Sequence, residues 1–260
     1  MATSSFSLTD VSWPGYLSMA SAIALHTSQH LRNTLTLRRM WPYLLLVALP
    51  IAAAAGLARL SIDDSSTIGR FYQHFAMRAL ALCALGLGVA AIRDDAEAGA
   101  LPLLLLKPRA PVALPVGRLI AVAILVCGLG ATMMAGTAGL MLGTLYSPDV
   151  GYMTRQVLAA LFGGFAYAGI FLGMGAVFKA ATGFGLGYLV AVDLLMAQWV
   201  DLAAKLSPSV YIGTLVQTLP GKELTAANTA AEMPGALAGL VLLGLAGGGV
   251  AVWKCRGDGV

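Results

Sequence analysis

The sequence RDDAEAGALPLLLLKPR, residues 93–109, separates two long apolar segments of the chain. It places three of the chain's twelve acidic residues, Asp94, Asp95 and Glu97, within four positions. A loop this charged is costly inside hydrocarbon, where neither charges nor free backbone groups find water. The stretch therefore predicts a water-facing turn between two membrane spans, with a short, partly amphipathic element at the membrane surface.

The composition on both sides of this stretch indicates a membrane protein. The 260 residues are 58% hydrophobic and 11% charged, whereas soluble domains average roughly 25% charged residues. A span needs about 20 apolar residues. We therefore expect an all-α membrane protein with six transmembrane helices in one domain, residues 41–260. The expected spans are 41–60, 71–92, 119–145, 156–178, 183–202 and 236–253.

Residues 1–40 are expected to form a polar tail and then an amphipathic interfacial helix from Pro14 to about Met40. Its polar side is expected to face water. His26 and His30 share one helix face, but a metal site needs about three or four ligands, so we interpret the pair as part of this solvated side. Residues 203–235 are expected to form an extracytoplasmic connection. Its apolar part, Val210–Leu219, is too short to cross and predicts a re-entrant or interfacial helix.

The basic residues predict the orientation of the chain. Ten of the sixteen Lys and Arg fall on one side of the expected membrane: Arg32, Arg38, Arg39, Arg93, Lys107, Arg109, Arg118, Lys179, Lys254 and Arg256. The others, Arg59, Arg70, Arg78, Arg155, Lys205 and Lys222, fall on or near the opposite side. The positive-inside rule places both termini and the 93–109 stretch in the cytoplasm. The net charge of +4 thus reflects membrane orientation, and we expect no nucleic-acid partner.

Motifs for ATP binding and for hydrolytic catalysis are not found in the sequence. Gly221-Lys222 is followed by Glu223, and no glycine stands five residues before Gly221, so the phosphate-binding loop pattern fails. We expect no catalytic residue, no bound metal and no cofactor in this chain. A process driven by ATP would need a separate subunit that binds ATP and Mg.

Asp193 lies near the centre of the fifth expected span, and Gln198 follows five residues later. A central Asp costs about 2.5–3.5 kcal/mol on insertion scales, so it needs a partner, neutralisation or water. Two interpretations remain open. Asp193 is either a protonated structural residue hydrogen-bonded to Tyr167 or a neighbouring Thr, or it lines a translocation path together with Gln198.

Glycine pairs spaced four residues apart occur at 139/143, 169/173, 235/239 and 244/248. Small residues at this spacing let membrane helices approach closely. They indicate either ordinary packing within the chain or a seam between two copies.

The 93–109 stretch resembles the loop after the second span of ABC-2 type permeases, the membrane subunits of ABC exporters. An acidic pair, a further acid, a glycine, leucines, a proline and basic residues carry the resemblance, with Gly117-Arg118 beyond them. The subgroup linked to maturation of multicopper enzymes is the most similar. Ala100 and Arg118 stand where family members often have Thr and Lys.

The resemblance implies a permease subunit that exports a substrate with ATP hydrolysed by a separate ABC ATPase. It also implies a second permease copy, so that a homodimer sits in a bacterial inner membrane among lipids. The ATPase would contact residues of the 93–109 stretch, namely Arg93, Asp94, Asp95, Glu97, Gly99, Leu101, Leu103, Lys107, Pro108 and Arg109. The alternatives are a standalone ion- or proton-coupled secondary transporter that uses Asp193, and a membrane anchor for an ATPase that transports nothing.

Overall fold

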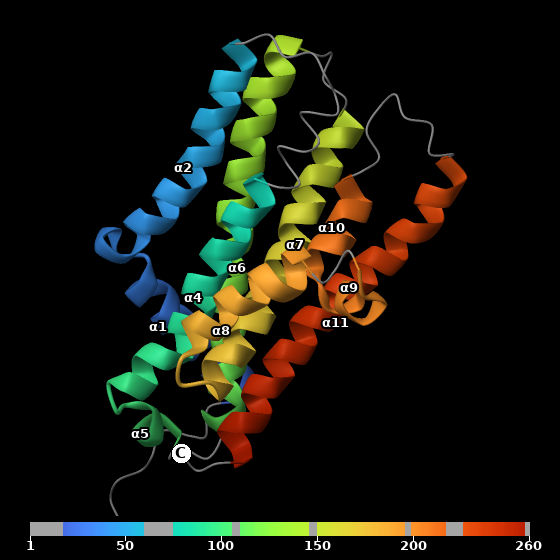
Figure 1. The fold of residues 1–260 in the computed structure, drawn as a ribbon. Coiled ribbons are helices and arrows are strands. Elements are labelled where there is room, and N and C mark those ends of the chain that lie inside the picture. Colours follow the sequence, from blue (N-terminus) through green and yellow to red (C-terminus); the bar gives the residue numbers. More distant parts are fainter. Residues whose placement is uncertain are drawn as a thin grey trace, which may run out of the picture.

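The computed structural model describes residues 18–59, 75–105, 110–145, 150–195, 199–216 and 226–257. Every element they form is a helix (Figure 1). The elements are α1 (Met19–Thr34), α2 (Leu37–Arg59), α4 (Met77–Glu97), α5 (Leu101–Leu105), α6 (Ala110–Leu145), α7 (Val150–Val177), α8 (Ala181–Gly187), the π-helix η3 (Tyr188–Leu195), α9 (Asp201–Leu206), α10 (Pro208–Val216) and α11 (Ala226–Gly257).

Four of these helices, α2, α6, α7 and α11, are long and apolar enough to cross a membrane, which indicates a membrane protein. The all-helical class is thus confirmed, and four of the six predicted crossings are found within the described residues. The helix α4 differs because its uncharged part, residues 79–92, covers only about 21 Å at 1.5 Å per residue. The apolar stretch Ala181–Asp193 of α8 and η3 is also shorter than a full crossing.

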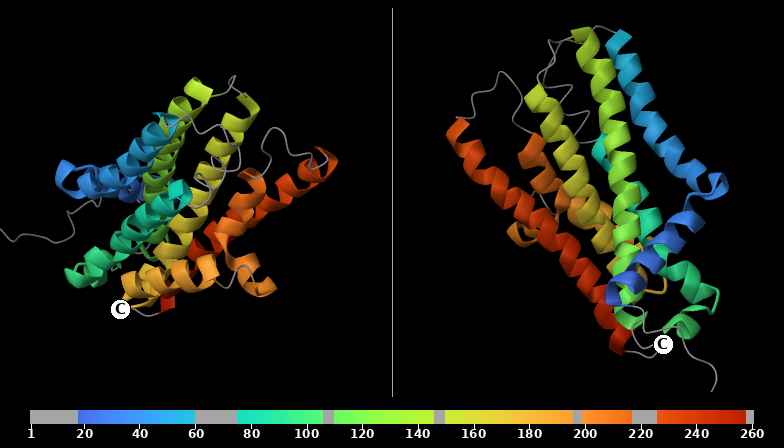
Figure 2. Two further views of the ribbon diagram at one scale, coloured as in Figure 1. Left: turned by 45° about the horizontal axis from the view of Figure 1, so that its top comes forward. Right: turned by 180° about the vertical axis from the view of Figure 1, so that it is seen from behind.

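The helix α7 lies at the centre of the molecule. It packs most extensively against α11, then against α4 and α6, while α1 and α2 pack on α6. In both Figure 1 and Figure 2 the helices α2, α6, α7 and α11 follow one another across the molecule. Tyr167, Phe171 and Leu172 of α7 are fully buried. One end of the molecule gathers α5, the α7–α8 turn and the C-terminal end of α11.

Glycines bring α7 and α11 into backbone contact. A Cβ atom built on Gly169 would collide with the backbone of Gly244, and one built on Gly173 would lie 2.7 Å from the carbonyl oxygen of Gly247. Small residues permit this approach because no side chain separates the two helix backbones. The 169/173 and 244/248 pairs therefore pack within one chain, whereas a Cβ atom on Gly139 or Gly235 would meet nothing within 4 Å.

Two helix boundaries differ from the sequence prediction. The expected interfacial helix is not continuous to Met40, because α1 ends at Thr34 and the first spanning helix begins at Leu37. Ser18 caps α1 by accepting a hydrogen bond from the Ser21 N–H at 3.2 Å, a role for which Ser is well suited. Pro14 lies outside the described residues. The helix α11 begins at Ala226, ten residues before the predicted start.

Candidate functional site

The helix α4 ends in a glycine-dependent turn that leads directly into α5. Gly99 has a φ of +66°, a left-handed conformation that glycine adopts at little cost. The Ala100 N–H donates to the Asp95 carbonyl oxygen at 2.9 Å, and the Gly99 N–H donates to the Ala96 carbonyl oxygen at 3.2 Å. These two bonds satisfy carbonyl groups at the helix end as in a Schellman motif. The turn is therefore defined by hydrogen bonds that fix how α5 leaves α4.

Asp95 faces into the protein and holds α4 to α6. Its carboxylate forms an ion pair with the guanidinium group of Arg118, and both side chains are largely buried, with 25% and 11% exposed. Because this acid already has an internal cationic partner, it is poorly placed to meet another protein. The predicted site residue Asp95 therefore braces the turn.

Asp94 and Glu97 face outward from the same helix. Asp94 pairs with Arg39 of α2 at 3.1 Å, and Glu97 pairs with Arg93 at 3.1 Å. The Asp94 side chain is 49% exposed and that of Glu97 is 67% exposed. Exposed pairs of this kind contribute at most about 1 kcal/mol. Both carboxylates can therefore exchange their present partners for cations of another protein.

The short helix α5 has one buried and one exposed leucine. Leu101 is only 5% exposed and belongs to the core, whereas Leu103 is 69% exposed. Leu101 packs α5 against the core, and Leu103 presents an apolar side chain on the surface of α5. The predicted site residues Lys107, Pro108 and Arg109 lie outside the described residues.

The prediction of a water-facing polar side on α1 is wrong for His26 and His30, which are 9% and 6% exposed. The α1 backbone lies against Gly117 of α6, where an added Cβ would come within 2.8 Å of the His26 Cβ. The Thr27 hydroxyl donates to the Gly117 carbonyl oxygen at 3.1 Å. The Arg118 guanidinium also reaches His30 Nδ1. Arg118 of α6 thus contacts both His30 of α1 and Asp95 of α4, and these three side chains link the three helices.

This link predicts a loss of stability at acidic pH. Burial, followed by the charges of Arg118 and Arg39, lowers the pKa of His30 to about 3. Below pH 6.5 the unfolded chain binds a proton that the folded chain excludes, so stability falls as pH falls. Between pH 7 and pH 5 we expect this histidine to account for about 2 kcal/mol of lost unfolding free energy.

Thermal unfolding of the detergent-solubilised protein at both pH values measures the effect. A His30→Gln variant should show a smaller pH dependence, and an unchanged dependence would contradict the prediction.

Asp193 lies in a second polar cluster, buried inside the chain. Its Oδ2 pairs with the Arg78 guanidinium and accepts a hydrogen bond from the Tyr167 hydroxyl at 2.8 Å. Its Oδ1 accepts from the Ser207 hydroxyl and from the Ser209 N–H, the latter at 3.2 Å. The Asp193 side chain is 0% exposed and that of Arg78 is 25% exposed. The tyrosine predicted as a partner is thus present, and an arginine accompanies it.

The same cluster joins the end of η3 to the start of α10. The Asp193 carbonyl oxygen accepts from the Ser209 hydroxyl at 3.1 Å and from Arg78 Nη2 at 3.3 Å. Backbone polar groups at membrane depth need such partners wherever a helix does not continue. Tyr167 lies ten residues from the C-terminal end of α7 at Val177, about 15 Å along the helix axis. The cluster therefore lies well away from that end of α7. Gln198, predicted with Asp193, lies outside the described residues.

The sequence analysis did not predict Arg78 as a partner of Asp193, because it counted Arg78 only among the basic residues on or near the side opposite to the charged stretch. The available signal was its isolation in the sequence, since fourteen uncharged residues follow it. Two isolated charges of opposite sign in neighbouring spans are expected to pair, since each alone is costly in the membrane.

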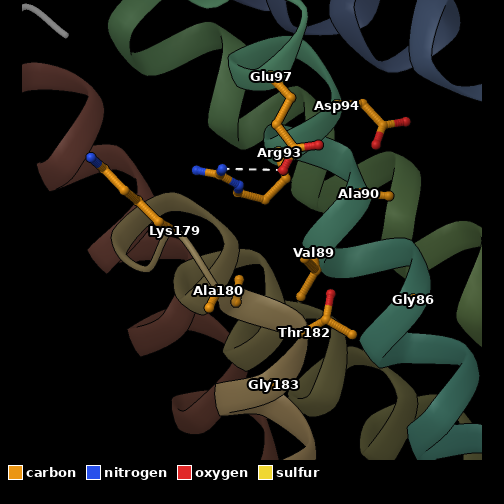
Figure 3. A pocket seen from close by; sticks show the side chains of 11 residues that line it. Gly86, Val89, Ala90, Arg93, Asp94, Glu97, Lys179, Ala180, Thr182 and Gly183 are labelled. Atoms are coloured by element: carbon orange, nitrogen blue, oxygen red, sulfur yellow. Dashed lines mark hydrogen bonds and ion pairs between the residues drawn. The ribbon is translucent and has the colours of Figure 1, made fainter.

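A cavity of about 390 Å³ opens beside the outward carboxylates, between α4 and the α7–α8 turn. Figure 3 shows Arg93 and Glu97 of α4 on one side of this region and Lys179 on the opposite side. Asp94 is also among the lining residues, but its carboxylate points away from Arg93 and Lys179. Its other lining residues are Gly86, Val89, Ala90, Ala180, Ala181, Thr182 and Gly183. The cavity thus has a charged mouth and a wall of small residues.

Among the described residues, no three His, Cys, Asp or Glu side chains lie close enough together to hold a metal ion. No protein-family model matches the chain, and no curated protein is significantly similar to it.

Proposed function

We propose that this chain is the permease subunit of an ABC-2 type exporter, which moves a substrate across the membrane with ATP hydrolysed by a separate ATPase subunit. The observation that carries the proposal is the α4–α5 turn at one end of the molecule (Figure 1). It presents two outward carboxylates and the exposed Leu103 on a turn braced from behind by the Asp95–Arg118 pair. This combination suits a protein partner that brings cations and an apolar groove.

The braced turn supports transfer of force into the membrane domain. A push on α5 acts on α4 through the hydrogen-bonded turn and on α6 through the Asp95–Arg118 pair. The far end of α4 is joined to η3 by the Arg78–Asp193 pair. In this proposal α4 works as a lever between the ATPase and the broken fifth span, whose movement changes access to a path at the interface of two copies.

The proposed topology has six crossings with both termini in the cytoplasm. The asymmetry of basic residues supports this orientation. The C-terminal ends of α4 and α11 and the α7–α8 turn lie at the end of the molecule that holds the α4–α5 turn (Figure 1), and they carry Arg93, Arg256 and Lys179. The working unit is a homodimer with two ATPases, placed in a bacterial inner membrane. ATP and Mg bind to the ATPases, and this chain supplies no catalytic residue.

The ion-coupled alternative receives less support from the Asp193 cluster. A carboxylate has about four acceptor positions, and four donors from the described residues already fill them. A transported cation would have to displace these donors.

The proposal predicts that reversing the outward charges weakens ATPase assembly. We expect an Asp94→Lys/Glu97→Lys variant to co-purify with its ATPase at least about tenfold less well, because two attractive charges become repulsive. Its thermal stability should change little, since both ion pairs are exposed. Copurification of the co-expressed subunits measures the effect.

The matched control is Arg256→Glu, which reverses an exposed charge at the same end of the molecule but outside the turn. It should assemble normally. Normal assembly of the double Lys variant would remove the α4–α5 turn from the ATPase interface.

A further inference from the structure

The cavity beside α4 has a feature that ATPase docking does not explain, because it extends along the helix toward the membrane interior. Its lining runs from Glu97 and Arg93 at the mouth to Gly86. Seven residues separate Arg93 from Gly86, which is about 10 Å along the helix. Away from these charges the lining includes Gly86, Val89 and Gly183, so the wall there is apolar and carries little side-chain bulk.

The mouth of the cavity carries both signs of charge. Lys179 forms no ion pair with any residue that the structure describes. The Nε atom of Arg93 is buried and has no hydrogen-bond partner in the part of the chain that the structure describes. The Arg93–Glu97 pair is an exposed i,i+4 contact, which is worth only about 0.2–0.5 kcal/mol. The side chains of Arg93, Lys179 and Glu97 can therefore contact a ligand at a small cost in free energy.

We infer that this cavity binds a membrane phospholipid whose headgroup carries a primary ammonium group, of the phosphatidylethanolamine kind. The phosphate would lie between Arg93 and Lys179, and the ammonium group would lie at Glu97. One headgroup thus satisfies both partners of the Arg93–Glu97 pair and supplies the absent partner of Lys179. The first carbons of an acyl chain would occupy the small-residue wall.

The position of the cavity supports this ligand. Arg93 is fifteen residues beyond Arg78 on α4, about 22 Å along the axis. The hydrocarbon half-thickness is about 15 Å, so the mouth lies at headgroup depth when the Arg78–Asp193 cluster is near the bilayer centre. A free phosphate would leave the acidic side of the mouth and the apolar wall unused. The inference depends on the membrane placement and shares Glu97 with the proposed ATPase contact, but its test needs no ATPase.

The test measures lipid binding to the delipidated protein in detergent by native mass spectrometry. The probes are phosphatidylethanolamine, phosphatidylglycerol and diacylglycerol with identical acyl chains, and inorganic phosphate as a competitor. We expect phosphatidylethanolamine to bind at least about fivefold more tightly than phosphatidylglycerol, and diacylglycerol to bind weakly. Lys179→Gln should weaken phosphatidylethanolamine binding about tenfold, because a charge-assisted contact with the phosphate is lost.

A second variant tests the cavity separately from its charge. An added Cβ at Gly183 meets nothing within 4 Å, so Gly183→Leu fills the open space without disturbing the fold and should abolish binding. The control Arg256→Gln removes an exposed cation at the same end of the molecule and should bind as the wild type does. Phosphatidylglycerol binding as tightly as phosphatidylethanolamine would overturn the inference. Equal effects of the Lys179 and Arg256 variants on phosphatidylethanolamine binding would also overturn the inference. The same holds if inorganic phosphate displaces the lipid at a concentration similar to that of the lipid.

Discussion

Replacing Arg78 with leucine is expected to destabilise the protein by roughly 3–5 kcal/mol, because the change leaves the Asp193 carboxylate buried without its cation. The Asp193 side chain is 0% exposed, so water cannot replace the lost partner. Tyr167, Ser207 and Ser209 would still donate hydrogen bonds. Those neutral donors do not compensate a charge in a region that excludes water. Thermal unfolding of the solubilised protein should show the loss directly.

A double variant separates the ion pair from the packing of its members. Arg78→Leu/Asp193→Leu removes both charges and should be less destabilised than either single variant, because no unpaired charge remains buried. Asp193→Asn should also be destabilising, since it leaves Arg78 without its counter-charge. Additive losses in the double variant would show that the two residues do not act as a pair.

A substitution at the α7–α11 crossing is expected to have a comparable effect. In Gly169→Ala the added methyl group would collide with the backbone of Gly244. Backbone atoms cannot move aside as a flexible side chain can, so the two helices must separate and lose contact along the crossing. We expect a loss of roughly 3 kcal/mol or more, at the upper end of the range for overpacked cores.

The matched control for this substitution is Gly249→Ala in α11, where an added Cβ meets nothing within 4 Å. It should be neutral or slightly stabilising, because Ala favours helix over Gly by about 1 kcal/mol. Similar stabilities for the Gly169 and Gly249 variants would mean that α7 and α11 do not approach as closely as described.

The sequence predicted the helical class and the charged turn, yet it did not separate the roles of the three acids. The helical periodicity distinguishes them. Asp94 and Glu97 are three residues apart and share a helix face, whereas Asp95 lies about 100° from Asp94 around the helix axis. Asp95 accordingly turns inward to Arg118, and the other two turn outward. The identity of the internal partner could not be read from the chain, because Arg118 is 23 residues distant.

Two polar side chains have internal partners that the sequence analysis did not predict. His30 of α1 was predicted to face water with the rest of the polar side, and Arg78 was counted on or near one side of the membrane without a partner. In the structure His30 and Arg78 each face a polar partner inside the protein, namely Arg118 and Asp193. Polarity in the sequence shows that a side chain needs a partner, but the partner can be another residue as well as water.

The central claim is that this chain couples to a separate ATPase through the α4–α5 turn. The most direct test is ATP hydrolysis in liposomes that contain the chain alone, the chain with its ATPase, or the Asp94→Lys/Glu97→Lys variant with that ATPase. We predict no hydrolysis by the chain alone, hydrolysis by the complex, and a loss of the chain-dependent activity in the variant. Hydrolysis by the purified chain alone, or unchanged activity of the variant complex, would contradict the claim.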